Sequence, residues 1–417
     1  MYKTSQHTFI FLFLKANTNS ICQTMKQRIL LSILLLLFIQ PLFAQTLLSE
    51  EDLEEERVYK NLEKALKKPS EVYILDLSGQ GLDKIPRDIG RFRRLQILKL
   101  TNNNLGELPR EMTRLVNLQI LYLDSNNFNT INFDVSNPRF YSNLEQIYLG
   151  FNPLRNIPED IKKLELVMVS LAGNKRLDLS QAFTPLAAIS SLESLDLSYL
   201  KLDTVPWEVA NIENLKTLNL SGNPSCEWDT SFRFLSQVAT IEKLILQENK
   251  LRSISEEVVG LDNIIELDLS HNERLNARQV LKTILPLKKL EVLDFSYCEL
   301  DELPKTIGEF SLLKELNISN NKITILPYEI KNLEEVEFLN LSFNELTELP
   351  SDISYMQSLE KLLIGHNPLE FLPKDIADLH ELEYIELPEG TMDKTEKKNV
   401  RKYLPEAEIV FIEGDDN

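Results

Sequence analysis

The stretch Leu313-Lys-Glu-Leu316-Asn-Ile318-Ser-Asn-Asn321-Lys-Ile323 has the form L-x-x-L-x-L-x-x-N-x-L. The same form recurs from Val72 to about Leu387 at steps of 22 to 26 residues. Its fourth and sixth positions lie two apart, so on a β-strand their side chains point to one face, which must be buried. One unit cannot bury its apolar face alone. Neighbouring units are therefore expected to stack as parallel strands around one shared core, forming a solenoid.

Fourteen such units can be traced along the chain, and in each of them the first, fourth and sixth positions are apolar. The units begin at Val72, Leu95, Leu118, Leu144, Leu166, Leu192, Leu215, Ile241, Ile264, Leu290, Leu313, Val336, Leu359 and Leu382.

The ninth position is Asn in ten of the fourteen units. At the sharp turn that leaves a strand, an Asn side chain can satisfy backbone groups that stacking would otherwise bury without partners. The ten residues are Asn103, Asn126, Asn152, Asn174, Asn223, Asn249, Asn272, Asn321, Asn344 and Asn367. The other units carry Gln80, Leu200, Cys298 and Gly390 there. Gln80 and Gly390 belong to terminal units, which are expected to be atypical, whereas Leu200 is an interior gap.

This pattern resembles the leucine-rich repeat family over roughly three quarters of the chain. The resemblance implies an α/β solenoid, a leucine-rich repeat horseshoe with a parallel concave sheet and about 14 repeats. It also implies that the ten asparagines form a structural ladder of hydrogen bonds, in which a cysteine such as Cys298 is an accepted alternative. Members of this family bind other molecules, and the repeats alone do not say which.

Two kinds of repeat alternate in the central part of the chain. Most repeats return through a segment of the form L-P-x-x-I-x-x-L, in which proline fixes φ and has no N–H to donate. Between Leu118 and Leu313 the repeat lengths alternate between 26 and 22 or 23 residues. The longer repeats lack the proline and carry helix-like stretches at 181–189, 231–238 and 277–285. We expect short helices on the convex side at every second repeat of this part.

The two ends of the chain differ from the repeats. Residues 1–44 are predicted to be a signal peptide region, because Lys26 and Arg28 precede an apolar run of about fifteen residues, too short to span a bilayer. An alternative start at Met25 would leave residues 1–24 out and confine the signal peptide to 25–44. Residues 45–71 are expected to form an N-terminal helical cap, with an amphipathic helix over 50–68.

The repeats are assigned to residues 72–387. Residues 388–417 are expected to form a C-terminal cap, with a helix over 393–403 and a strand over 408–413, followed by an acidic tail.

The chain is strongly acidic, with 45 Lys and Arg against 64 Asp and Glu and a net charge of −19 at pH 7. Residues 1–44 contain four basic and no acidic residues, so their removal would leave a charge of −23. Such a charge disfavours nucleic acid and anionic membranes, and it favours solubility and basic or metal-rich partners. The plainer interpretation of this charge is a solvated surface. We predict no nucleic acid partner; the repeats and the short leader further predict a protein ligand and no stable membrane insertion after signal cleavage.

The repeats contain no recognisable catalytic or metal-binding set. His271 and His366 occupy the same position in repeats four apart, roughly 19 Å at strand spacing, which is too far to share a metal. Cys226 and Cys298 lie three repeats apart, roughly 14 Å, beyond the ~7 Å Cα limit for a disulfide. We expect both cysteines to be free and buried. No cofactor and no metal are expected.

Strand positions three, five, seven and eight are expected to face outward on the concave side. Early repeats place aromatic and apolar residues there, which are typical of interfaces when they face solvent on neighbouring strands. Later repeats give an acidic stretch with tyrosines beside it. The predicted partner-binding residues are Ile120, Tyr122, Tyr148, Phe151, Met168, Asp196, Tyr199, Glu266, Asp268, Asp294 and Tyr297. The alternative is that these aromatic rings only pack on one another across the strands.

Three functional hypotheses follow. The first is an exported, extracytoplasmic protein without catalysis that recognises a protein, or less favourably a glycan, on its concave face; its leader and C-terminal cap resemble those of secreted bacterial members of the family. The second is an intracellular signalling scaffold, because the L-P-x-x-I-x-x-L return resembles cytoplasmic repeat proteins that regulate small GTPases and kinases. The third is an enzyme resembling repeat-bearing bacterial ubiquitin ligases. It is disfavoured because the 30 residues after Leu387 are too few for a catalytic domain.

Overall fold

The computed structural model describes residues 47–413 of the 417-residue chain. The chain divides into two compact units, residues 1–55 and 56–417. The described part of the first unit contains one short helix, α2 (Glu50–Glu54). Ser49 closes its N-terminus, because Ser49 Oγ accepts the N–H of Asp52 and the carboxylate of Asp52 accepts the N–H of Ser49. The predicted signal peptide region, residues 1–44, lies outside the described residues.

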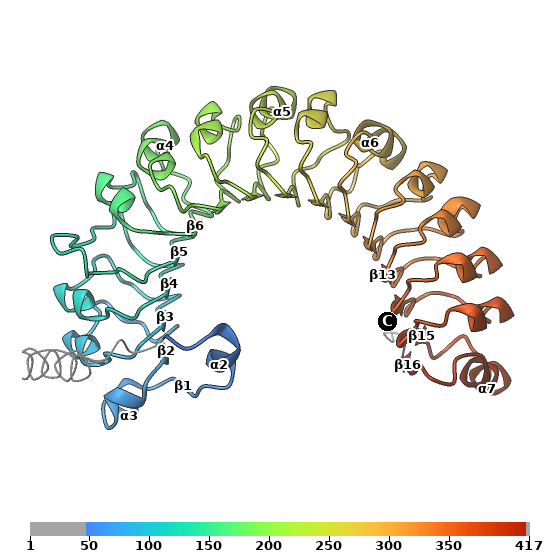
Figure 1. Cartoon of the computed structure of the whole chain (residues 1–417), viewed down its shortest axis with the longest axis horizontal. Helices are drawn as coiled ribbons and strands as arrows, with labels where there is room; N and C mark the ends of the chain where they lie inside the picture. Colours follow the sequence, from blue (N-terminus) through green and yellow to red (C-terminus); the bar gives the residue numbers. More distant parts are fainter. Residues whose placement is uncertain (1–46, 414–417) are drawn as a thin grey trace, which may run out of the picture. The chain divides into compact units, whose positions relative to one another are not determined.

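The second unit is built on one parallel sheet of 16 strands, in which each strand pairs with its neighbours in sequence. The coils stack in an arc with this sheet on the inner side, as Figure 1 shows. The strands are β1 (Val58–Tyr59), β2 (Ile74–Asp76), β3 (Ile97–Lys99), β4 (Ile120–Tyr122), β5 (Gln146–Tyr148), β6 (Met168–Ser170), β7 (Ser194–Asp196), β8 (Thr217–Asn219), β9 (Lys243–Ile245), β10 (Glu266–Asp268), β11 (Val292–Asp294), β12 (Glu315–Asn317), β13 (Phe338–Asn340), β14 (Lys361–Leu363), β15 (Tyr384–Pro388) and β16 (Glu408–Ile412).

Strands β2 to β15 are the strands of the fourteen predicted repeats, paired position by position. Leu98 of β3, for example, lies opposite Leu121 of β4. Strands β1 and β16 add one strand at each end of the sheet. The predicted α/β solenoid, a horseshoe with a parallel concave sheet, is confirmed.

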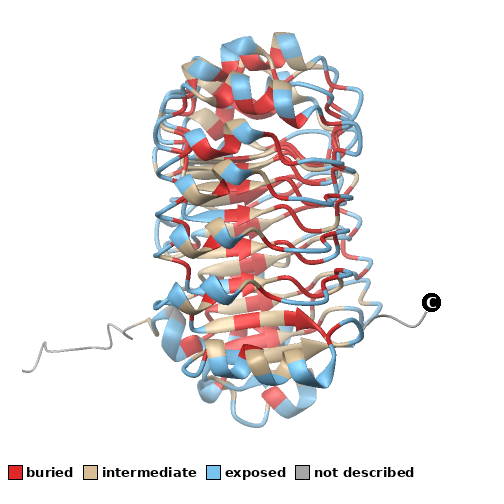
Figure 2. Ribbon diagram, turned by 90° about the vertical axis from the view of Figure 1, so that its right-hand side faces the viewer, coloured by how far each residue is buried: buried red, intermediate tan, exposed pale blue. Residues whose placement is uncertain are grey.

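The core lies between the sheet and the return segments. Leu95, Leu98 and Leu100, which are the first, fourth and sixth residues of one repeat, are completely buried. Burying one such side chain stabilises a fold by roughly 1.5–3 kcal/mol, and every coil repeats the contribution. Figure 2 shows the result as buried residues that follow the stacked strands from coil to coil.

The return segments on the convex side are short 3₁₀-helices in most repeats. Most of them begin directly after the proline of the L-P-x-x-I-x-x-L segment, whose φ suits the start of a helical turn. They are η1 (Pro69–Glu71), η2 (Arg87–Arg91), η3 (Arg110–Arg114), η4 (Glu159–Lys163), η5 (Trp207–Asn211), η6 (Glu256–Gly260), η7 (Lys305–Glu309), η8 (Tyr328–Asn332), η9 (Ser351–Tyr355) and η10 (Lys374–Asp378).

Three of the longer central repeats carry α-helices instead: α4 (Leu179–Ala187), α5 (Trp228–Leu235) and α6 (Ala277–Ile284). They alternate with η5, η6 and η7 along the chain. The prediction of a convex helix at every second central repeat is confirmed for these three repeats.

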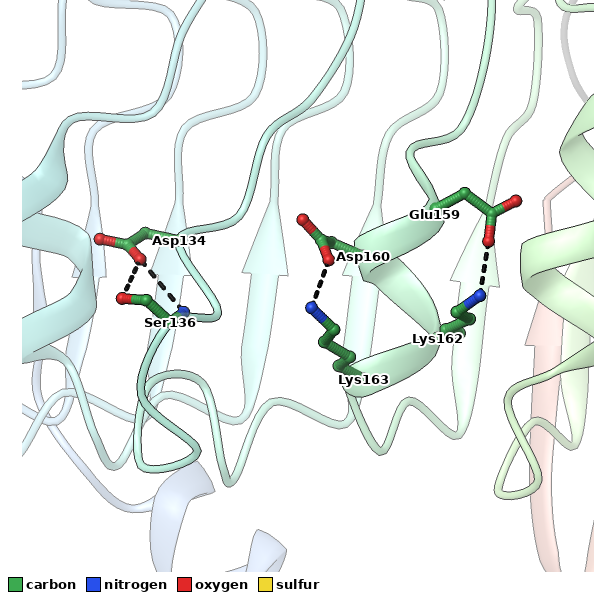
Figure 3. Close-up of polar contacts among 6 residues, drawn as sticks. All are labelled: Asp134, Ser136, Glu159, Asp160, Lys162 and Lys163. Atoms are coloured by element: carbon green, nitrogen blue, oxygen red, sulfur yellow. Dashed lines mark hydrogen bonds and ion pairs between the residues drawn. The ribbon is translucent and has the colours of Figure 1, made fainter.

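That prediction is wrong for the first long repeat, residues 118–143, which forms no helix. Its return segment is rich in asparagine and β-branched residues and contains Pro138, all of which are unfavourable in a helix. The segment is held by local contacts instead. The carboxylate of Asp134 accepts the N–H of Ser136 at 3.2 Å and its Oγ–H at 2.6 Å (Figure 3). The rings of Phe133 and Tyr141 meet edge to face, with centroids 5.2 Å apart.

The next repeat shows the contrast on the same surface. Its helix η4 carries two ion pairs between residues three apart, Lys162–Glu159 and Lys163–Asp160, each at 2.6 Å (Figure 3). All four side chains are exposed, so each pair contributes only about 0.2–1 kcal/mol.

The amphipathic helix predicted over residues 50–68 is wrong. The sequence forms α2, then β1, then a second short helix, α3 (Leu62–Ala65). Asn61 starts α3, because its side chain accepts the N–H of Lys64 at 2.9 Å. Between the two helices Val58 pairs with Ile74 of β2, so β1 covers an edge that would otherwise be open.

The C-terminal elements agree with their predictions. Helix α7 (Lys394–Tyr403) begins at Asp393, whose carboxylate accepts the N–H of Glu396 at 2.8 Å. Strand β16 then pairs with β15 along five residues. Within residues 47–413, no helix is long and apolar enough to cross a membrane.

Candidate functional site

The concave face is held in shape by the asparagine at the ninth position of the repeat. Asn272 is representative. Its Nδ2 donates to the carbonyls of Leu246 in the preceding coil, at 3.0 Å, and of Leu269 in its own coil, at 2.8 Å. Its Oδ1 accepts the N–H of Leu251 at 2.9 Å and that of Asn249 at 3.1 Å. All ten asparagines are buried, and each donates to a carbonyl of the preceding coil.

Cys298 makes the same kind of contact with a thiol. Its Sγ–H donates to the carbonyl of Leu269 at 3.2 Å, in the preceding coil. Burial raises the pKa of this thiol to about 12, so it stays protonated and can donate. Cys226 and Cys298 are both free and buried, as expected.

The eighth position of the first thirteen repeats has a left-handed backbone, with φ between 53° and 67°. Glycine adopts this conformation freely, whereas for other residues the left-handed backbone costs roughly 1–2 kcal/mol. Six of the thirteen positions nevertheless carry an aromatic or imidazole ring. We name these six residues the ring row: Phe151, Tyr199, His271, Tyr297, Phe343 and His366.

The six rings of the ring row lie in three pairs along the arc. His271 and Tyr297 stack with centroids 4.2 Å apart, and Phe343 and His366 stack at 3.9 Å. The rings of Phe151 and Tyr199 are 6.1 Å apart.

Glycines at the eighth position of the intervening coils make room for two of these rings. Phe151 lies against Gly173, and Tyr199 lies against Gly222; a Cβ at either glycine would collide with the ring. The ring row is therefore packed on the backbone and still open to solvent, since Phe151 remains 53% exposed.

Tyr122 and Tyr148 form a second aromatic group on β4 and β5. They lie opposite each other in the register, and their rings stack with centroids 4.4 Å apart. Lys99 Nζ lies 5.5 Å from the ring centroid of Tyr122. Burial and the neighbouring Tyr122 raise the pKa of Tyr148 to about 12, and its hydroxyl donates to Gln146.

Ile120 and Met168 complete this group. They occupy the same register position on β4 and β6, on either side of Gln146, and both are partly exposed. The structure thus brings Ile120, Tyr122, Tyr148 and Met168 together on the concave face. Phe151, predicted with them, lies with Tyr199 in the ring row instead.

The predicted acidic stretch is less free than its sequence indicates. Asp196, Asp268 and Asp294 stand at the fifth position of their repeats, and each accepts the N–H of the serine two residues on. The distances are 3.0 Å to Ser198, 3.0 Å to Ser270 and 2.7 Å to Ser296. These carboxylates therefore close the turns that leave the strands.

Neighbouring coils use the remaining acceptor atoms of this stretch. Ser170 Oγ–H donates to Asp196 at 2.8 Å, and Asn317 donates to Asp294 at 2.8 Å. Glu266 forms an ion pair with Lys243 at 2.6 Å. Burial raises the pKa of Asp294 and outweighs the hydrogen bonds from Ser296, which act in the opposite direction.

Sequence reasoning missed three members of the ring row, His271, Phe343 and His366. The repeat alignment contained the signal, because all three stand at the eighth position beside Phe151, Tyr199 and Tyr297. It also missed a concave cluster at the C-terminal end, in which Lys361 Nζ lies 5.5 Å from the ring centroid of Phe338 and 5.3 Å from that of Tyr384. Among residues 47–413 no group of three His, Cys, Asp or Glu side chains is placed to hold a metal ion.

Comparison with known proteins agrees with this architecture. A leucine-rich repeat region model matches residues 278–404, and a leucine rich repeat model matches residues 70–128. The leucine-rich repeat protein LIC12759 of Leptospira interrogans is 33% identical; the match covers 85% of this chain and 100% of that one, with a TM-score of 0.57. The chain is a leucine-rich repeat protein.

Two other solved structures match this leucine-rich repeat protein at lower sequence identity. An internalin, inlF of Listeria monocytogenes, is 18% identical, with 84% of this chain and 89% of that chain covered and a TM-score of 0.44. TLR13, solved in a complex with ssRNA13, is 18% identical, with 85% and 61% covered and a TM-score of 0.50. No curated protein matches the sequence.

Proposed function

We propose that this leucine-rich repeat protein is a non-catalytic binding module that recognises a protein partner through its concave face. The observation that carries the proposal is the stacked pair Tyr122 and Tyr148, which lies on the solvent side of the sheet with Ile120 and Met168 beside it. Tyr and Met are enriched at the cores of protein interfaces. Proteins of this repeat type generally serve as binding surfaces rather than as enzymes, because the stacked sheet forms an extended concave face.

The proposed contact surface extends from this pair along the arc. It includes the ring row members Phe151, Tyr199 and Tyr297, and the partly exposed carboxylates of Asp196, Glu266, Asp268 and Asp294. The three aspartates remain on the concave face although they also accept hydrogen bonds within their turns. A partner with basic residues opposite the aspartates and apolar residues opposite the tyrosines fits this surface.

Site-specific photo-crosslinking tests the proposal directly. A benzoylphenylalanine in place of Tyr122 is expected to crosslink to a discrete protein of the source cells or their surroundings. The matched control is the same replacement of Tyr355, a 60% exposed tyrosine of η9 on the convex side, which is expected to give no such product.

The variant Tyr122→Ala/Tyr148→Ala then tests the pair itself. We expect it to unfold at nearly the native temperature, since both side chains are partly exposed, and to lose the crosslinked partner in a pull-down. Undiminished capture by a folded variant would rule the pair out as the interface.

We also propose that the protein is exported and works outside the cytoplasm. The basic residues and apolar run of the segment 25–44 support this proposal. Mass spectrometry of the mature N-terminus after cell fractionation tests it. A chain that begins near Gln45 outside the cytoplasm is expected; a cytoplasmic chain that retains Met1 or Met25 would favour the intracellular signalling scaffold instead.

A further inference from the structure

The turns that follow the ring row carry a local excess of positive charge. We use the name central flank for these turns in six consecutive repeats, from the one that begins at Leu144 to the one that begins at Ile264. The central flank comprises positions eight to thirteen of each of these repeats. Its seven basic residues are Arg155, Lys175, Arg176, Lys201, Lys250, Arg252 and Arg274. Its five acidic residues are Asp178, Asp203, Glu227, Glu248 and Glu273. The whole chain has a net charge of −19, so an edge of the solenoid with more basic than acidic residues is unusual. The stacking of the repeats does not require these exposed charges.

These basic side chains are available to a ligand. All seven are exposed, and within the part of the chain that the structure describes none of them forms an ion pair. Lysines elsewhere are paired between coils, such as Lys216 with Glu193 at 3.0 Å and Lys314 with Glu291 at 2.8 Å. The central flank thus presents cationic groups that no neighbouring carboxylate neutralises.

The surface is hollowed where these groups meet the ring row. One hollow of about 910 Å³ is lined by Tyr199, Glu248, Lys250, Arg252, His271 and Arg274, among others. Tyr199 is fixed at its rim, because its hydroxyl donates to Glu248 at 2.9 Å across the coil of Gly222. A second hollow of about 580 Å³ lies earlier on the same flank, beside Arg155 and Arg176.

We propose that the central flank binds an acidic glycan, a chain of sugar rings that carries widely spaced carboxylate groups. Guanidinium and ammonium groups form charge-assisted hydrogen bonds to such anions, and the planar guanidinium of Arg252 or Arg274 can bind one in a bidentate way. The rings of Tyr199 and Phe151 offer flat surfaces for the apolar faces of sugar rings. The carboxylates of Glu248 and Glu273 accept hydrogen bonds from sugar hydroxyls.

The interleaved carboxylates favour a glycan over single-stranded nucleic acid, which also binds aromatic and basic residues together. A nucleic acid carries a phosphate at every nucleotide, so its closely spaced charges would meet Glu248 and Glu273 and the negative charge of the whole chain. A glycan with a carboxylate on alternate sugar rings has fewer charges per length than a nucleic acid, and it has many hydroxyl donors. A run of aspartate or glutamate in a peptide has the charges but lacks the hydroxyls and the rings.

This site shares Phe151 and Tyr199 with the proposed protein contact surface but does not include Tyr122 and Tyr148. Loss of the protein partner in the Tyr122→Ala/Tyr148→Ala variant and loss of glycan binding in a variant of the central flank are therefore separate outcomes. The test is titration of the full-length protein, by calorimetry, with a size-defined hyaluronan oligosaccharide, a chain of alternating N-acetylglucosamine and glucuronic acid. We expect binding that weakens as the salt concentration rises. The variant Lys250→Glu/Arg252→Glu/Arg274→Glu is expected to bind at least tenfold more weakly.

Lys322→Glu is the matched control. Lys322 stands at the tenth position of its repeat, like Lys250, but it lies on the C-terminal side and is paired with Glu299 at 3.5 Å. We expect its affinity to stay within twofold of the native value. If the triple charge reversal lowers the unfolding temperature, the milder Lys250→Gln/Arg252→Gln/Arg274→Gln is used, with a loss of about threefold or more expected.

Tyr199→Ala separates stacking from charge. We expect a several-fold loss of affinity that persists at high salt, where the contribution of the basic residues is screened. The proposal is overturned if native protein does not bind the oligosaccharide, or if Lys322→Glu weakens binding as much as the triple variant. It is also overturned if oligothymidylate or polyglutamate of similar length binds as tightly, because the flank would then recognise charge alone.

Discussion

The central repeats and the C-terminal repeats have the same backbone conformation, but the turns along their flank carry net charges of opposite sign. Turns of the central flank carry seven basic and five acidic residues, whereas the same positions in the four repeats from Leu290 to Leu359 carry one basic residue and six acidic ones. Those residues are Lys322 against Glu299, Asp301, Glu302, Glu345, Glu348 and Glu370. Strand register and the left-handed eighth position are the same in both regions. Stacking therefore specifies the framework positions and leaves the flank free to differ.

The convex sides of the two regions differ for a geometric reason. Helices α4, α5 and α6 occur in repeats of 26 residues, and the C-terminal repeats of 23 residues hold only 3₁₀-helices within the described residues 313–381. Two or more turns of α-helix take more residues than a single short 3₁₀ segment. The extra residues lie on the convex side, so the strands of the concave face stay in register.

The largest expected effect comes from breaking the asparagine ladder in each region. Asn272→Ala removes the acceptor of two buried N–H groups, those of Asn249 and Leu251, and is expected to cost about 3 kcal/mol or more. Asn344→Ala removes the acceptor of Ile323 only, since the N–H of Asn321 donates to the carbonyl of Phe343. We expect its cost to be smaller by about 1 kcal/mol.

Urea unfolding followed by circular dichroism measures both variants. Cys298→Ala serves as the control, because a thiol is a weak donor and its loss is expected to cost less than either asparagine. Equal losses for Asn272→Ala and Asn344→Ala would show that the ladder does not distinguish the two regions.

The next effect concerns the left-handed eighth position. Gly222→Ala in the central region adds a Cβ that collides with the ring of Tyr199 at a φ of 67°, and we expect a cost of about 2–3 kcal/mol. Asn320→Ala in the C-terminal region changes a residue that already tolerates a φ of 55°, with an expected cost of about 1 kcal/mol.

A double-mutant cycle isolates the collision. In a Tyr199→Ala background, Gly222→Ala is expected to cost no more than Asn320→Ala does, because only backbone strain remains. A cost that stays unchanged without the ring would contradict the contact.

A smaller effect is expected at the residue before the 3₁₀-helix. Ser255 stands where the C-terminal repeats have proline, with a φ of −66° and a ψ of 147° that proline can adopt. Ser255→Pro is therefore expected to stabilise the protein by about 0.4–1 kcal/mol, chiefly by restricting the unfolded chain. Pro304→Ser in the C-terminal region should do the reverse. Thermal unfolding measures both, and a destabilising Ser255→Pro would mean that this return segment needs the serine.

The smallest effects are changes of stability with pH at the fifth position. Burial raises the pKa of Asp294 above its ordinary value of 3.8, so ionisation disfavours the folded state as pH rises through that range. Asp294→Asn keeps the acceptor for Ser296, as Asn317 and Asn340 do for their serines. We expect its unfolding temperature, relative to the native protein, to be higher at pH 7 than at pH 3.

Asp76 at the first repeat is the control with the opposite sign. Burial acts to raise its pKa, but hydrogen bonds from Ser78 and the charges of Lys99 and Lys60 outweigh it, so the pKa is lowered. Its carboxylate therefore stabilises the fold above about pH 4 and loses that effect as pH falls through the lowered pKa. Asp76→Asn is expected to lower the unfolding temperature slightly at pH 7 and to have no effect at the acid end. The same pH profile for both variants would contradict the assignment.

Local and repeated patterns could be predicted from the sequence, because each coil restates them. The strands, the asparagine positions, helices α4 to α6 and the pair α7 and β16 all follow from spacing and turn chemistry within a few residues. The helix over 50–68 could not be predicted correctly, because pairing of Val58 with Ile74 outcompetes the helical pattern of that segment.

The functional surfaces belong to the tertiary structure. Sequence determined that Tyr122 and Tyr148 stand at the same position of adjacent repeats, but only stacking brings their rings within 4.4 Å. Tertiary contacts also decided that Asp294, which closes its own turn with Ser296, accepts a second hydrogen bond from Asn317 of the next coil. The central flank brings together residues up to about 120 positions apart in the sequence. Each repeat places the same position only one strand spacing, roughly 4.8 Å, further along the sheet. Sequence by itself determined the repeating framework, since the same residue types recur at the same positions of successive coils, and only the stacking of coils decided which side chains share a surface.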